Sequence, residues 1–291
     1  MTMPSHPLRG GVFALLVSVL APAALAAPDV ATIAPGVRLL SGTSGNVLIV
    51  DGPTGALIVD DERATDIAEI EAAVGAGPVR IVINTHWHLD HSGGNEAFAK
   101  AGATIIAQRN VRLRRRTDQF MAAYNKTIPA APADALPSVV FDAALDVYQG
   151  GETLHLTHAP NAHTDGDIIV RLEKANVLHL GDIFFNGLFP FIDTGSGGGI
   201  QGLIAAVDTA LALADAKTVI VPSHGAIADR AALQAYRDML ADVSAKVEAG
   251  IAAGKSLEEI RDSHPAAPYQ DHLQGDADRF VTAIYESLTK T

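Results

Sequence analysis

The sequence contains no cysteine, few aromatic residues and few charged residues. Of its 291 residues, 5% are aromatic, 19% are charged and one is tryptophan. The absence of cysteine excludes disulfides, thiolate catalysis, cysteine-bound zinc and iron–sulfur clusters. Any metal chemistry must therefore use nitrogen and oxygen ligands, and 11 histidines are available for it.

Cations are also scarce, because 21 Lys and Arg residues stand against 33 Asp and Glu residues, for a formal net charge of −12. A nucleic-acid-binding surface needs an excess of basic residues to neutralise phosphates. We therefore predict no nucleic-acid partner. The hydrophobic fraction of 48% and the chain length are typical of a large globular domain with a substantial core.

The N-terminus has the pattern of a secretory signal peptide. Arg9 precedes the apolar run 12–21, and Ala24-Leu25-Ala26 resembles a cleavage site. The run is shorter than the ~20 residues that a membrane-spanning helix needs. We predict that residues 1–26 are removed and that the mature protein is periplasmic, without stable membrane insertion. The oligomeric state stays open.

We predict that residues 27–291 form a single domain with a helical C-terminal tail. Hydrophobic runs predict strands at 37–40, 46–50, 56–60, 79–83, 104–107, 139–141, 154–157, 168–172, 177–180 and 219–221. Helical spacing predicts helices at 63–74, 96–100, 111–123 and 201–214, and two long amphipathic stretches after residue 229, around a break at 264–265. Strands interleaved with helices favour layered α/β packing.

The strongest functional motif is His86-x-His88-x-Asp90-His91, which directly follows the predicted strand 79–83. Side chains at i and i+2 of a strand end point to the same side, so His86 and His88 can share one metal ion. Asp90 and His91 follow in a loop that can turn toward a second ion. A desolvated cluster of this kind without a metal would be costly, which favours a metal site.

Three further candidates, His163, Asp182 and His224, each lie beside the end of a predicted strand. Sites gather at strand ends in layered α/β folds. Each residue alone is weak evidence, because His-Gly and Gly-Asp pairs are common. In this order after the first motif, they form a specific pattern.

Together these motifs resemble those of the metallo-β-lactamase-fold hydrolases, from Asp60 to His224. The resemblance implies a four-layer αββα sandwich, with two sheets face to face and helices outside. The ligands that it implies are His86, His88 and His163 for a first ion, Asp90, His91 and His224 for a second ion, and Asp182 as a bridge between both.

The implied cofactor is a pair of Zn²⁺ ions, although nitrogen and oxygen ligands also suit iron or manganese. A water between two ions ~3.5–4 Å apart loses a proton near neutral pH and can attack a carbonyl. We therefore expect a hydrolase of a small-molecule amide, ester, thioester or lactone, with Asp90 and Asp182 as the catalytic residues. Hydrolysis of β-lactams is possible within this class.

The chain departs from two well-known members of this group. The cysteine-using zinc β-lactamases carry Cys at the position of Asp182, Arg at that of His91, and a substrate-gripping Lys where this chain has Phe185. Glyoxalase II enzymes end in a basic helical extension that residues 269–291 do not match. Two alternatives stay open: a mononuclear iron oxidoreductase acting on sulfur compounds, and a metal-binding module without catalysis.

Several residues near the motifs allow two interpretations. Asp60 and Asp167 are candidates for carboxylates that orient a ligand imidazole, or for turn caps. The apolar stretch 184–192 forms either core or a wall beside the metals. Glycines at 195–199 predict a mobile segment. The histidines that we expect not to be ligands are His155, His158, His179, His264 and His272.

Overall fold

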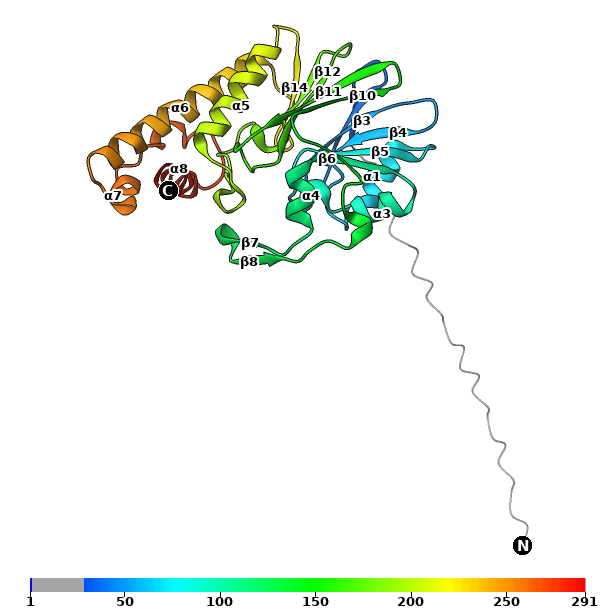
Figure 1. The fold of residues 1–291 in the computed structure, drawn as a ribbon, viewed down its shortest axis with the longest axis horizontal. Helices are drawn as coiled ribbons and strands as arrows, with labels where there is room; N and C mark the ends of the chain where they lie inside the picture. Colours follow the sequence, from blue (N-terminus) through cyan, green and yellow to red (C-terminus); the bar gives the residue numbers. More distant parts are fainter. Residues whose placement is uncertain (2–28, 291) are drawn as a thin grey trace.

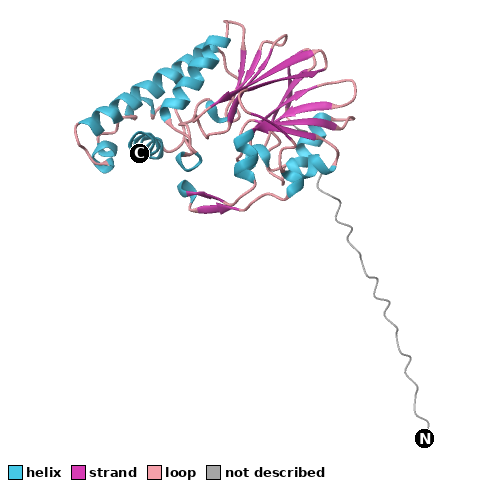
Figure 2. Ribbon diagram, viewed as in Figure 1, coloured by secondary structure: helices cyan, strands magenta, loops and turns pink. Residues whose placement is uncertain are grey.

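The structure is a computed structural model that describes residue 1 and residues 29–290. The predicted signal peptide 1–26 therefore lies, apart from Met1, outside the described residues. Two β-sheets pack face to face between two groups of helices (Figures 1 and 2). This arrangement confirms the predicted four-layer αββα sandwich.

The first sheet has seven strands, in the order β1-β2-β3-β4-β5-β6-β9. Their bounds are β1 (Val30–Ala34), β2 (Val37–Ser41), β3 (Asn46–Val50), β4 (Ala56–Val59), β5 (Val79–Asn84), β6 (Thr104–Gln108) and β9 (Val139–Phe141). Strands β1 to β4 are antiparallel neighbours, whereas β4, β5, β6 and β9 run parallel.

The second sheet has five strands, in the order β10-β11-β12-β13-β14. Their bounds are β10 (Ala144–Gln149), β11 (Glu152–Ala159), β12 (Asp167–Leu172), β13 (Val177–His179) and β14 (Val219–Val221). Only the last pair, β13 and β14, is parallel. A separate hairpin pairs β7 (Gln119–Met121) with β8 (Lys126–Ile128).

Hydrophobic runs without polar alternation become strands that are buried on both faces. In β3, Leu48 and Val50 point into the core between the two sheets, where they meet Leu154 and Val170 of the second sheet. The intervening Ile49 points to the opposite face, into a core shared with helices. Side chains alternate along a strand, so this arrangement requires apolar residues at every position.

Helices cover the outer face of each sheet (Figure 1). The first sheet is covered by α1 (Ile67–Val74) and α3 (Asn95–Lys100), and α4 (Arg109–Arg115) packs against β6 and β9. The second is covered by α5 (Ile200–Leu213) and α6 (Arg230–Ala252), against which α8 (Ala277–Thr289) packs, while α7 (Leu257–Asp262) joins α6 to α8. Among the described residues, no helix combines the length and apolar character needed to cross a bilayer.

Two sequence predictions about local structure are wrong. The helix predicted at 111–123 ends at Arg115, and the chain continues into the β7–β8 hairpin. The two strands of the hairpin are joined by a short 3₁₀ turn, Ala122–Tyr124, that ends at left-handed Asn125. The tail contains three helices rather than two, because Ser256 and Glu259 form a capping box that starts α7. Local turn and cap chemistry outweighed the apolar spacing in both places.

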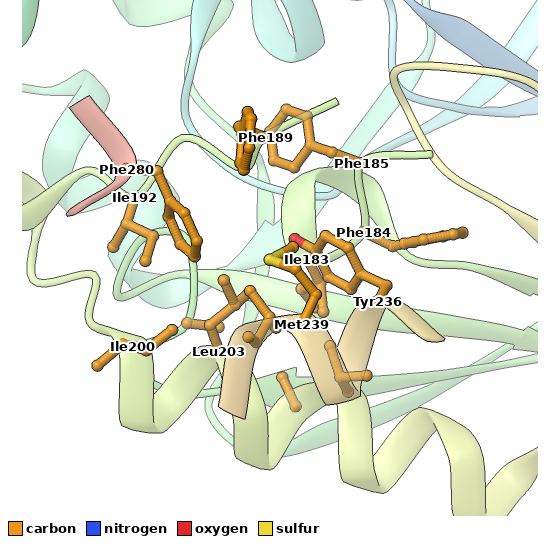
Figure 3. Close-up of a cluster of buried hydrophobic side chains, with 14 of the residues drawn as sticks. Ile183, Phe184, Phe185, Phe189, Ile192, Ile200, Leu203, Tyr236, Met239 and Phe280 are labelled. Carbon is orange, nitrogen blue, oxygen red and sulfur yellow. The ribbon is translucent and has the colours of Figure 1, made fainter. Parts of the chain in front are cut away.

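The largest core lies between the second sheet and its helices (Figure 3). Phe184 is 1% exposed, and its ring packs edge-on against Tyr236 of α6 with 5.0 Å between ring centroids. Phe189 packs against Phe280 of α8, with centroids 6.0 Å apart. The apolar stretch 184–192 therefore contributes to the core, as one of its two interpretations predicted.

Candidate metal centre

Five segments meet at one edge of the sandwich, where strands of both sheets end. The neighbouring parallel pairs β4–β5 and β13–β14 end at this edge, which is where sites form in sheets of this kind. After β5 come His86 and His88, and the short helix α2 (Leu89–Ser92) carries Asp90 and His91. The loop between β11 and β12 carries His163, while Asp182 follows β13 and His224 follows β14.

A glycine allows the segment after β13 to approach β5. Gly181 has a left-handed φ of 54°, and a Cβ at this position would lie 2.8 Å from Oγ1 of Thr85. Only glycine accepts both the backbone conformation and the close contact. This turn places Asp182 directly beside the histidines that follow β5.

Three imidazole nitrogens converge in the first cluster, formed by His86, His88, His163 and Asp182. Nδ1 of His88 lies 3.0 Å from Nε2 of His86 and 2.9 Å from Nε2 of His163. All three rings are buried. The sequence prediction that His86 and His88 face the same point is confirmed by this geometry, and the fold adds His163 from the other sheet.

The outer nitrogen of each ring donates a hydrogen bond. Nε2 of His88 donates to Asp193 at 3.0 Å, Nδ1 of His163 donates to the carbonyl of Phe191 at 2.7 Å, and Nδ1 of His86 donates to Oγ1 of Thr85 at 3.1 Å. The three inner nitrogens therefore carry lone pairs that point at one another. Such an arrangement repels itself unless a cation lies between the nitrogens, and it fits a metal ion.

The second cluster contains Asp90, His91 and His224. Oδ2 of Asp90 lies 3.7 Å from Nε2 of His91 and 3.6 Å from Nε2 of His224. Within the described residues, Nε2 of His91 is buried without a hydrogen-bond partner. An orphaned buried nitrogen beside a carboxylate is the environment that a second cation would satisfy.

Asp182 lies between the two clusters. Its Oδ2 is 3.5 Å from Nε2 of His163, whereas its Oδ1 is 3.5 Å from Nε2 of both His91 and His224. Within the described residues, Oδ1 also has no hydrogen-bond partner. One carboxylate thus presents one oxygen to each cluster, as a bridge between two ions would. The assignment of individual ligands stays a prediction.

Asp60 links the two clusters through hydrogen bonds. It accepts hydrogen bonds from Nδ1 of His91 at 2.9 Å, from the backbone N–H of Thr85 at 2.7 Å and from the Thr85 hydroxyl at 2.9 Å. It therefore orients His91 directly and His86 through Thr85, as one reading of the sequence expected. Asp167 does not orient a histidine, because its carboxylate accepts from the backbone and hydroxyl of Thr164 instead.

The sequence analysis missed Asp193, which holds His88. Asp193 is buried, accepts from Nε2 of His88 and from the hydroxyl of Ser196, and lies 105 residues away from His88 in the chain. Its only local signal is an Asp-x-x-Ser turn. The glycines that predicted mobility pack closely here, since a Cβ on Gly198 would collide with the carbonyl of His163.

The electrostatics of the site follow from burial and from its carboxylates. Burial lowers the pKa of His86 well below its usual range and, despite the nearby Asp182, lowers that of His163 to about 4. Burial also opposes charge on His91, but Asp182, Asp90 and Asp60 outweigh it and raise its pKa to about 10. His86 and His163 are therefore neutral, and a metal ion would displace the proton of His91.

A cavity of about 690 Å³ opens onto both clusters. Asp90, Asp182, His88 and His224 line it, and the rest of the wall is mostly apolar. Other lining residues are Trp87, Leu89, Met121, Tyr124, Ile128, Phe185 and Phe191, with Arg63 and Lys126 as the cations. The stretch 184–192 therefore provides a wall beside the site as well as core.

The described histidines that we expected not to be ligands lie outside both clusters. His155 pairs with Asp146 on the surface, at 2.7 Å, and Nε2 of His158 donates to the carbonyl of Asp165. His179 is buried next to Gly181, whose N–H donates to its Nδ1. Their surroundings agree with structural roles.

Comparison with known proteins identifies the family. Residues 40–224 match the model of the metallo-beta-lactamase superfamily, and the chain belongs to this superfamily. A metallo-beta-lactamase from Pontibacter korlensis superposes with a TM-score of 0.61 at 21% identity, covering 74% of this chain and 99% of the other. A metallo-beta-lactamase from Hirschia baltica gives 0.58 at 20% identity, covering 73% and 97%.

A third similar structure is the stereoselective inverting sec-alkylsulfatase from Pseudomonas sp. It superposes with a TM-score of 0.63 at 18% identity, covering 89% of this chain but only 50% of the sulfatase. At such identities these likenesses establish the fold. Together with the buried His and Asp clusters, the family identifies this chain as a metal-dependent hydrolase of the superfamily.

Proposed function

We propose that this protein is a dinuclear zinc hydrolase of a small-molecule ester, thioester, lactone or amide. One observation carries the proposal: Asp182 presents Oδ2 to a cluster of three converging imidazole nitrogens and Oδ1 to a second cluster. Two divalent ions held there would supply a deprotonated water and polarise the substrate oxygen.

The residues of the chain would prepare this reaction in three ways. His86, His88 and His163 would hold the first ion, and Asp90, His91 and His224 the second. The apolar cavity wall excludes water around the substrate, which strengthens every charge interaction inside it. Asp90 is a part-exposed carboxylate that lines the cavity, where it can accept the proton that the water gives up before it attacks.

The test combines metal analysis with a substrate panel. Purified protein should contain two zinc ions per chain and lose activity with a chelator, and zinc should restore it. The panel consists of a chromogenic β-lactam, a thioester, a lactone, a carboxylic ester and a secondary alkyl sulfate, the last because of the sulfatase neighbour. One iron per chain, or no turnover of any compound by the zinc-loaded protein, would contradict the proposal.

We further propose that the protein is exported to the periplasm, and that it acts there on small molecules without a nucleic-acid or membrane partner. The N-terminal pattern and the excess of 33 acids over 21 bases support this. N-terminal sequencing of periplasmic material should find Ala27 or Pro28 first. Retention of Met1 in the exported protein would contradict the signal-peptide assignment.

A further inference from the structure

The β7–β8 hairpin forms one wall of the cavity, although it belongs to neither large sheet. Met121 and Ile128 supply apolar surface, Tyr124 supplies an aromatic ring and Lys126 supplies a charge. Figure 1 shows the hairpin standing apart from the two sheets, beyond α4. A segment that the sandwich core does not need is therefore placed where a substrate would bind.

The hairpin is fixed in this position on two sides. The ring of Tyr124 lies 5.5 Å from that of Phe191, and the guanidinium of Arg279 on α8 lies 5.1 Å from the Tyr124 ring centroid. On the other side, Ile128 joins a small buried cluster with Trp87. These contacts give Lys126 a defined location at the cavity.

The charges around the cavity are separated by position. Its acids, Asp90 and Asp182, both lie beside the histidines of the two clusters. Its cations, Arg63 and Lys126, are exposed, and neither has an ion pair or side-chain hydrogen bond with another described residue. The chain has 12 more acids than bases, so acidic partners for these two cations are plentiful in the sequence. Because both cations nevertheless stay unpaired at the cavity, their positions favour an anionic ligand.

We propose that the substrate is an anionic amphiphile, with an apolar body beside the bond that is cleaved and a carboxylate remote from that bond. The apolar body would lie along Phe185, Phe191 and the hairpin, and the carboxylate would meet Lys126 and Arg63. A cavity of about 690 Å³ is of the size that holds a drug-sized ligand. This inference names the substrate class of the site proposed above and rests on that function.

The first experiment compares two esters of equal length. Mono-4-nitrophenyl adipate carries a remote carboxylate, and its terminal amide is the neutral counterpart. Lys126→Met removes the charge but keeps an apolar stem. Because the lysine is exposed, we expect kcat/KM for the anionic ester to fall only about fivefold, and about tenfold when Arg63→Gln is added. The neutral ester should change by less than twofold.

A matched control is Lys100→Met, which alters a lysine of α3 that pairs with Glu96 and lies outside the cavity. This variant should leave both esters unchanged. The preference of the wild type for the anionic ester should also shrink as salt is added, because exposed charges are screened. Equal kcat/KM for both esters in the wild type, unchanged in Lys126→Met, would overturn the proposal while leaving the hydrolase function intact.

The second experiment needs no turnover. Trp87 is the only tryptophan of the chain and lines the cavity, so its fluorescence reports ligand binding. Titration of the zinc-loaded protein with 6-phenylhexanoate should give tighter binding than 6-phenylhexanamide, and Lys126→Met should weaken the carboxylate alone. If this holds while no ester is hydrolysed, the recognition stands and the proposed hydrolysis fails. Loss of binding that is equal for both ligands would overturn the role of Lys126.

Discussion

The hydrogen bonds of Asp60 give the sharpest prediction about the metal centre. Replacement of Asp60 by Asn keeps the size of the side chain, and Asn tolerates the left-handed φ of 66° at this position. One carboxylate oxygen, however, becomes an amide NH₂. The remaining oxygen can still accept from the backbone N–H of Thr85, but the NH₂ then faces the N–H of His91 and the Thr85 hydroxyl.

The magnitude follows from which histidines lose their acceptor. His91 loses its direct partner, whereas His86 is affected only through Thr85. Loss of an acceptor that orients a ligand histidine costs about 10- to 100-fold in metal affinity, or about 1.4 to 2.8 kcal/mol. We therefore expect the second zinc to bind 10- to 100-fold more weakly, and the first zinc to change by less than about threefold.

The assay is calorimetric titration of the metal-free protein with zinc, resolved into two binding steps. The control is Asp61→Asn, at an adjacent and equally buried carboxyl group that accepts from the backbone of Gly94 rather than from a histidine. Burial raises the pKa of Asp61 well above its usual range, so its neutral form already resembles Asn. Unchanged zinc binding in Asp60→Asn, or an equal loss in Asp61→Asn, would refute this reasoning.

Four further variants test other parts of the structure. Asp182→Asn should weaken the second zinc at least tenfold, about 1.4 kcal/mol, because one charge no longer lies between two dications; a competition titration with a chelator measures this. Asp193→Asn should instead weaken the first zinc in the same titration, since it removes the acceptor of His88. Phe184→Ala should lower the free energy of unfolding in urea by about 3–5 kcal/mol without changing zinc stoichiometry. Burial raises the pKa of Asp167 from 3.8 to about 7, so between those values the folded state keeps a proton that the unfolded chain releases. Wild type should therefore lose stability relative to Asp167→Asn as the pH rises from 4 to 7, and an opposite or flat trend in urea denaturation would contradict the assignment.

Local sequence was sufficient wherever one segment carried its own signal. The run 46–50 predicted a strand because a short, nearly continuous apolar run is typical of a strand that is buried on both faces. One face of this strand packs against the second sheet, and the other packs against helices. The spacing of His86 and His88 predicted a shared target because i and i+2 point to the same side of an extended chain. The edge strands β1 and β10 were missed because their exposed faces weaken the hydrophobic pattern.

Tertiary structure decided everything that depends on segments meeting across the fold. Whether His163 and Asp182 reach the same point as His86 depends on the approach of the two sheets, and the sequence allowed their grouping only through a family resemblance. Asp193 had only the signal of a local Asp-x-x-Ser turn, because its role toward His88 exists only when residues 191–199 pack against the His163 loop. The helix expected at 111–123 ends at Arg115, and the position of the hairpin that follows depends on contacts with distant segments, of Tyr124 with Phe191 and Arg279 and of Ile128 with Trp87.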